Sequence, residues 1–132
     1  MLGDPEVKRV LAIDDDLTTL TMISLACRSM QANVRLETAS TVERANWLCR
    51  QNRFDLIFLD HQLGTMTGIE WLDGMKQVLR PSTGVVVFSG ELQPADLSAY
   101  HRRGVVQIIS KRSLTLGTMS NTLQKALELS CV

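Results

Sequence analysis

The chain has 132 residues, a hydrophobic fraction of 45% and a formal net charge of zero, which together describe one globular domain with a buried core and argue against nucleic-acid binding. No run is long and apolar enough to span a membrane, so no membrane contact is expected. The three cysteines, Cys27, Cys49 and Cys131, are odd in number and lack CxxC spacing, which argues against a disulfide framework or a zinc site and fits a reducing cytoplasm.

The first half of the chain predicts two strands, each followed by a helix. An apolar strand covers 8–13, and a second strand, over 34–38, alternates apolar and polar residues, as an edge strand does. Ser40 and Glu43 form a sequence typical of a capping box, which predicts where the second helix begins. The helix faces expected to point inward carry Leu20, Ile23, Cys27 and Met30 in the first helix, and Val42, Ala45, Leu48 and Cys49 in the second.

The second half predicts three more strands. Those over 55–59 and 84–88 are apolar throughout and therefore central, whereas Gln107 interrupts the strand over 105–109, which places it at the other edge. A loop over 62–67 precedes the third helix, and the fourth helix, over 94–103, is expected to end at Gly104. The third helix is expected to bury Ile69, Leu72, Met75 and Leu79, and the fifth Leu116, Met119, Leu123 and Leu127.

Alternating strands and helices predict an α/β fold with a doubly wound, five-stranded parallel sheet. The order 2-1-3-4-5, with right-handed crossovers, places the two predicted edge strands at the edges and the other three in the interior. In this order the chain reverses its direction across the sheet between the first and third strands. Ligands bind outside the carboxyl ends of the strands at such a switch point, so a site is expected there.

Polar residues follow the predicted strands where this site should lie. Asp14 and Asp15 follow the first strand, Asp60 the third, Ser89 the fourth, and Lys111 comes two residues after the fifth. Two carboxylates about 4 Å apart repel by about 4 kcal/mol at an effective dielectric constant of 20. Mg²⁺ would relieve this repulsion, since it binds carboxylates together with water and phosphate oxygens. The sequence therefore predicts a magnesium site completed by a phosphoryl group.

Asp60 is the best candidate nucleophile, because it stands on a central strand and carboxylates form acyl phosphates. The charge on a phosphoryl group in transfer could be shared by Mg²⁺, Lys111 and the Ser89 hydroxyl. Asp16 is expected to cap the first helix instead of joining the site. His61 is expected to be a surface or packed histidine, pointing off the opposite side of the strand end. The two tryptophans are expected to be partly buried packing residues: Trp47 and Trp71.

Four segments together resemble the receiver domain of two-component response regulators, a CheY-like domain: VLAIDDDLTTL, DLIFLDHQLGTMTGIEWL, VVVFSG and VVQIISK. The resemblance runs from about residue 8 to residue 129 and implies a single receiver domain over 1–132 with a flavodoxin-like (βα)5 fold. It implies Asp14 and Asp15 as the acidic pair, with Asp15 the more direct Mg²⁺ ligand, and the Gln62 carbonyl as a further ligand. Asp60 becomes the phosphoacceptor, Ser89 the phosphate-binding hydroxyl and Lys111 the phosphate-binding lysine.

Three positions depart from the family pattern. Leu63-Gly64-Thr65 stands where Met-Pro-Gly is usual, and Arg112 follows Lys111 where the family has proline. Ile108 occupies the position of the aromatic residue that normally swings inward on phosphorylation. These departures concern the reporting of phosphorylation more than its acceptance, and they motivate the alternative of an interaction module with weak or phosphorylation-independent switching.

The resemblance implies a signalling module, not an enzyme, that takes its phosphoryl group from a sensor histidine kinase or a histidine phosphotransfer protein. Its output would go to a downstream effector or an attached output domain, or to a homodimer through the face of the fourth helix, fifth strand and fifth helix. The chain is either a stand-alone receiver or part of a longer regulator. A haloacid-dehalogenase-like phosphatase is a third hypothesis, because Asp14 and Asp16 have the Asp-x-Asp spacing which that chemistry needs.

Overall fold

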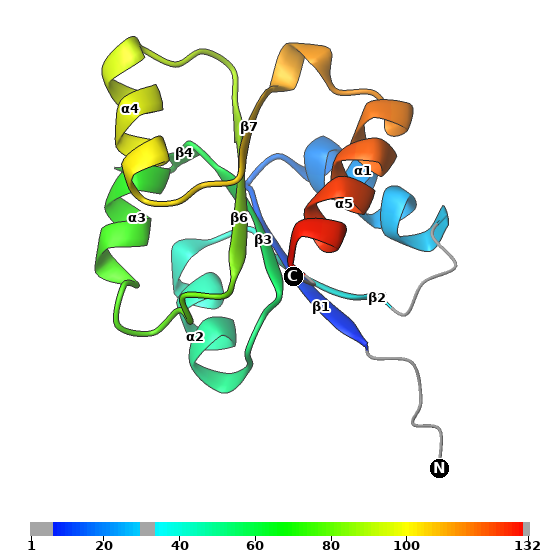
Figure 1. Cartoon of the computed structure of the whole chain (residues 1–132), viewed down its shortest axis with the longest axis horizontal. Helices are drawn as coiled ribbons and strands as arrows, with labels where there is room; N and C mark the ends of the chain where they lie inside the picture. The colour runs from blue at the N-terminus through cyan, green and yellow to red at the C-terminus, as the bar shows by residue number, and fades with distance from the viewer. Residues whose placement is uncertain (1–6, 30–33, 131–132) are drawn as a thin grey trace.

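Five parallel strands form the central sheet of the computed structural model, which describes residues 7–29 and 34–130 (Figure 1). The strands lie in the predicted order 2-1-3-4-5, which confirms the doubly wound architecture. In spatial order they are β2 (Val34–Ala39), β1 (Lys8–Ile13), β3 (Leu56–Asp60), β6 (Gly84–Ser89) and β7 (Gln107–Ser110).

Helices cover both faces of this sheet. α2 (Val42–Gln51), α3 (Gly68–Gly74) and α4 (Pro94–Arg102) lie on one face, and α1 (Leu17–Ser29) and α5 (Leu116–Ser130) lie side by side on the other (Figure 1). None of the helices in the described residues is both long enough and apolar enough to cross a bilayer.

The core has two layers because successive strand residues point to opposite faces of the sheet. Leu11, Ile57 and Val87 pack toward α2, α3 and α4, whereas Phe58 and Val86 pack toward α1 and α5. The three interior strands are almost completely buried, as their continuous apolar runs predicted.

The strand register places the polar strand ends in one row. Ile13 pairs with both Ala39 and Leu59, and the next row contains Asp60 paired with Phe88. At the far edge Ser89 pairs with Ser110. Side chains that follow or end these strands therefore gather at one edge of the sheet.

Two strands begin and end later than the predicted ranges 55–59 and 105–109. β3 includes Asp60 because this residue still pairs with Phe88 in the neighbouring strand. β7 begins only at Gln107, because the backbone N–H of Val105 donates to the Tyr100 carbonyl and so still belongs to the turn after α4.

The predicted start of α2 was wrong by one residue. Thr41, not Ser40, is the N-cap, and its side chain accepts a hydrogen bond from the backbone N–H of Arg44. Glu43 therefore lies one position too early to close a capping box. A capping box does begin α3, where Thr67 and Glu70 satisfy each other's backbone N–H groups.

Several details within the predicted helices and loops differ. The expected loop over 62–67 contains a small antiparallel hairpin of β4 (Gln62–Leu63) and β5 (Met66–Thr67), turned at Gly64 with a φ of +68°. α3 ends before Met75 and Leu79, although both still contact the core. Leu116, the first residue of α5, is exposed, and Met30 lies outside the described residues.

Candidate functional site

Three carboxylates meet at the carboxyl edge of the sheet. Asp14 and Asp60 are buried at the ends of β1 and β3, and Asp15 is exposed beside them. One oxygen from each of the three lies within 4.8 Å of the others. The parallel register of the strands therefore brings together residues that are far apart in the sequence, as predicted.

Local hydrogen bonds fix the acidic loop after β1. The backbone N–H of Asp14 donates to the carbonyl of Ala39, and Asp14 Oδ1 accepts from the N–H of Asp16. Asp16 turns away and caps α1, with Oδ1 2.9 Å from the backbone nitrogen of Thr18. The prediction that Asp16 caps the helix is confirmed.

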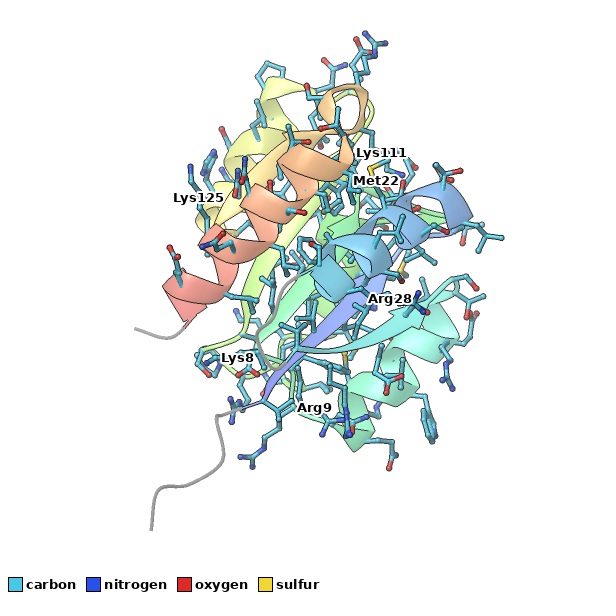
Figure 2. All side chains as sticks on the ribbon, turned by 90° about the vertical axis from the view of Figure 1, so that its right-hand side faces the viewer. Lys8, Arg9, Met22, Arg28, Lys111 and Lys125 are labelled. Carbon is cyan, nitrogen blue, oxygen red and sulfur yellow. The ribbon has the colours of Figure 1, made fainter. Side chains whose placement is uncertain are left out.

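Lys111 supplies the positive charge of the site. Its Nζ lies 2.9 Å from Asp14 Oδ2 and 3.3 Å from Asp60 Oδ2. Lys111 begins a short 3-10 helix (Lys111–Ser113) directly after β7, so the end of the sheet aims its side chain inward. Figure 2 shows Lys111 at the opposite end of the molecule from Lys8 and Arg9, which start β1.

The crowding of charge changes the acidity of the site. Burial, together with the charge of Asp14, raises the pKa of Asp60 to about 6, although Lys111 acts in the opposite direction. Burial alone would lower the pKa of Lys111, but its contacts with Asp14 and Asp60 outweigh burial and raise it. The pocket thus holds two carboxylates for one ammonium group, and an added cation would stabilise it.

Ser89 and Gln62 occupy the remaining predicted positions. Ser89 is buried at the end of β6, one residue beyond the partner of Asp60 in the ladder. The side chain of Gln62 is exposed, and its backbone N–H points to Asp60 Oδ1 at 3.4 Å. Both residues therefore lie near Asp60, Ser89 by its place in the neighbouring strand and Gln62 through its main chain.

The donor set fits Mg²⁺. Octahedral Mg²⁺ holds oxygens at about 2.1 Å, so opposite ligands are about 4.2 Å apart. The spread of at most 4.8 Å among the carboxylate oxygens is slightly wider, which a small side-chain rotation or one bridging water would close. Asp15, which is exposed and has no described ion pair, can approach an ion at the mouth of the pocket.

The contact between His61 and Tyr100 was not predicted. Both side chains are buried, and the Tyr100 hydroxyl lies 2.5 Å from His61 Nδ1. His61 is packed, as expected, but the sequence pattern did not identify Tyr100 on α4 as its partner. The sequence did show that Asp96 and Tyr100 lie on the same face of a helix, because they are four residues apart.

The tryptophans and cysteines separate into exposed and buried residues. Trp71 is buried and its indole N–H donates to Asn46 Oδ1 at 2.8 Å, whereas Trp47 is 55% exposed, so the expectation that Trp47 is a packing residue was wrong. Trp47 instead faces solvent beside the guanidinium group of Arg44. Cys27 and Cys49 are buried thiols, as expected. Cys131 lies outside the described residues.

Comparisons with known proteins agree with this arrangement. A family model described as the response regulator receiver domain matches residues 10–124. Over 67 residues, or 48% of this chain, the sequence is 36% identical to the sensor histidine kinase AruS of Pseudomonas aeruginosa, of which the match spans only 7%.

Solved structures of the same fold superpose along almost the entire chain. The CheY-like receiver domain protein of Methanospirillum hungatei JF-1 has a TM-score of 0.81 at 21% identity, covering 95% of this chain and 97% of that one. The chemotaxis protein CheY4 of Vibrio cholerae has a TM-score of 0.78 at 26% identity, covering 92% and 100%. The fold of this chain is thus the fold of these receiver proteins.

Proposed function

This chain belongs to the response regulator receiver domain family, and we propose that Asp60 is the residue on which it accepts a phosphoryl group. Receiver domains are phosphoacceptor modules of two-component signalling. The observation that carries the assignment of Asp60 is its place in the pocket: it is a buried strand-end carboxylate within 3.3 Å of the Lys111 ammonium group. Asp14, by contrast, is more deeply buried and closer to that lysine, whose charge it neutralises.

The proposed step is an in-line transfer from a phosphohistidine. One carboxylate oxygen of Asp60 attacks the phosphorus, and the new O–P bond forms as the P–N bond breaks. The electron pair of the broken bond stays on the imidazole nitrogen of the donor. Lys111 and the Ser89 hydroxyl group would each bind one phosphoryl oxygen, which positions the group and balances its charge.

Asp14, Asp15, the Asp60 carboxylate and the Gln62 carbonyl are the proposed ligands of Mg²⁺. When bound, Mg²⁺ supplies positive charge for the phosphoryl oxygens. Asp14 also holds Lys111 in place through the 2.9 Å ion pair, so that its ammonium group remains beside Asp60.

Incubation with acetyl phosphate and Mg²⁺, followed by intact-mass measurement, tests the proposal. Wild type should gain the mass of one phosphoryl group, and Asp60→Asn should gain none. Asp16→Asn is the matched control, since asparagine can retain the helix cap, and it should be labelled like wild type. Equal labelling of Asp60→Asn and wild type would refute the assignment.

A phosphorylation-independent interaction module is not favoured. Burial and the charge of Asp14 oppose the ionisation of Asp60, which destabilises the fold at neutral pH. A module that works without phosphorylation would gain nothing from this arrangement. The phosphatase hypothesis is weaker too, because Asp16, its required second acid, is engaged in capping α1.

The partners follow from the same chemistry. We propose that a sensor histidine kinase or a histidine phosphotransfer protein donates the group, and that an effector protein, an attached output domain or a second copy through α4, β7 and α5 reads it. Residues 1–132 would act as a single receiver unit. A reducing compartment such as the cytoplasm suits the buried, unpaired Cys27 and Cys49.

A further inference from the structure

His61 connects the end of β3 to α4. Its side chain is buried directly after Asp60, and each ring nitrogen faces one residue of α4. Nδ1 lies 2.5 Å from the hydroxyl group of Tyr100, and Nε2 lies 3.9 Å from Asp96 Oδ2. Asp96 and Tyr100 are four residues apart and therefore share the helix face that holds the imidazole.

One hydrogen bond joins the Tyr100 hydroxyl group to the imidazole of His61. Burial, followed by the charges of Asp96 and Asp60, raises the pKa of the Tyr100 phenol, so its hydroxyl group keeps its proton. The hydroxyl group can donate to Nδ1 or accept from it, and the tautomer of the imidazole decides which. In the tautomer with its proton on Nε2, the hydroxyl group donates to Nδ1 and the Nε2–H faces the Asp96 carboxylate.

The same group of contacts reaches the acceptor. The backbone N–H of His61 donates to the Phe88 carbonyl at 2.9 Å, next to Ser89, and the N–H of Gly68 donates to the His61 carbonyl at 2.7 Å. Gly68 also packs closely against both Tyr100 and Asp60. A Cβ atom there would lie 2.6 Å from the Tyr100 hydroxyl and 3.1 Å from the Asp60 carbonyl oxygen.

We propose that His61 and Tyr100 are positioning residues that transmit the phosphorylation of Asp60 to α4, in place of the aromatic side chain that is absent at Ile108. The inference rests on the proposed function of Asp60 and goes beyond it by naming the route. Phosphorylation brings about −1.5 to −2 charges to the residue next to His61. The charge of Asp60 already reaches the Tyr100 phenol, whose ionisation it disfavours.

α4 can respond because its first turn depends on the same side chains. Asp96 Oδ2 accepts the backbone N–H of Gln93, the N-cap of the helix, and also faces His61 Nε2. A shift of the imidazole would therefore change the start of α4 through Asp96 and its last turn through Tyr100. Leu97, which is 38% exposed on this helix, would carry the change to the surface.

Hydrogen exchange of α4 in the presence of beryllofluoride and Mg²⁺, which mimic the phosphoryl group, tests the route. In wild type the exchange rate over 94–102 should change by about fivefold or more, the usual lower range of coupling between sites. Tyr100→Phe keeps the ring but removes the hydroxyl group, so it should bind beryllofluoride like wild type and lose this change. Ile108→Val is the matched control and should retain it.

Two variants of His61 make the test independent of Tyr100. His61→Leu should lose the α4 response, and His61→Asn, whose amide can occupy the position of Nδ1, should recover part of it. A merely structural role would alter the basal exchange of these variants but not the difference between the two states. A full response in Tyr100→Phe, or equal loss in Tyr100→Phe and Ile108→Val, would overturn the route. Failure of wild type to bind beryllofluoride would instead refute the proposed function.

Discussion

The ammonium group of Lys111 lies 2.9 Å from Asp14 Oδ2, and this ion pair forms where β7 and β1, which are not neighbours in the sheet, point to the same pocket. Lys111 is only partly exposed, and Asp14 is buried. Because the pair holds the lysine next to Asp60, it links the stability of the fold to the charge balance of the site.

Replacing Lys111 should destabilise the protein in a pH-dependent way. Lys111→Met leaves two buried carboxylates without their cation, and we expect a loss of about 2 kcal/mol at pH 8 without Mg²⁺, less than the roughly 3–5 kcal/mol of a fully buried pair. The loss should shrink toward pH 5, because Asp60, with a pKa of about 6, is then protonated. Urea unfolding at both pH values measures this. Lys125→Met, which alters an exposed lysine on α5, should have little effect at either pH.

Replacing Asp60 should stabilise the protein at high pH. Its pKa is about 6 in the folded protein and 3.8 without the protein environment, so the folded state binds more protons between these values. Stability therefore falls as the pH rises through this window and is lowest above it. Asp60→Asn should raise the free energy of unfolding at pH 8 by on the order of 2 kcal/mol, an advantage that disappears near pH 4. Urea unfolding of both proteins at the two pH values measures the difference.

Asp73 offers a control of opposite sign for this experiment. A hydrogen bond from Arg103 lowers the pKa of Asp73, so its charged form supports folding. Asp73→Asn should never be more stable than wild type at pH 8. If Asp60→Asn and Asp73→Asn change the unfolding free energy in the same direction, the charge balance described for the pocket is wrong.

Mg²⁺ affinity should depend on Asp15 and not on Asp16. Asp15→Asn removes one of three clustered carboxylates and should weaken Mg²⁺ binding by about tenfold or more, as loss of one ligand or its support does. Asp16→Asn changes the same net charge one residue later but preserves a capping side chain, so it should bind within about twofold of wild type. Calorimetric titration with MgCl₂ distinguishes them, and equal weakening would indicate a general charge effect.

Gly68 should tolerate no side chain. Gly68→Ala places Cβ 2.6 Å from the Tyr100 hydroxyl and 3.1 Å from the Asp60 carbonyl, so overpacking should cost about 1–3 kcal/mol. Gly74→Ala in the same helix meets nothing within 4 Å and should be neutral or stabilising by about 0.5–1 kcal/mol. Thermal unfolding of the two variants compares them, and equal melting temperatures would contradict the close packing of α3 against Tyr100.

Local pattern was enough for most of the fold. The continuous apolar runs of β1, β3 and β6 and the interrupted runs of β2 and β7 identify central and edge strands, because burial on one or both faces acts directly on residue choice. The start of α2 was misplaced, since Ser40 and Thr41 are both common N-cap residues and only the folded backbone shows that Thr41, which accepts the Arg44 N–H, is the cap.

The sequence by itself determined the parallel sheet, its order and the convergence of Asp14, Asp15, Asp60, Ser89 and Lys111 at one edge, since strand ends and chain reversal follow from short-range patterns. Only the tertiary structure decided that Lys111 pairs more closely with Asp14 than with Asp60, and that Tyr100 reaches His61 across 39 residues. The physical reason is that such contacts depend on how α4 and the end of β7 pack against the sheet. No periodicity in the chain encodes that packing.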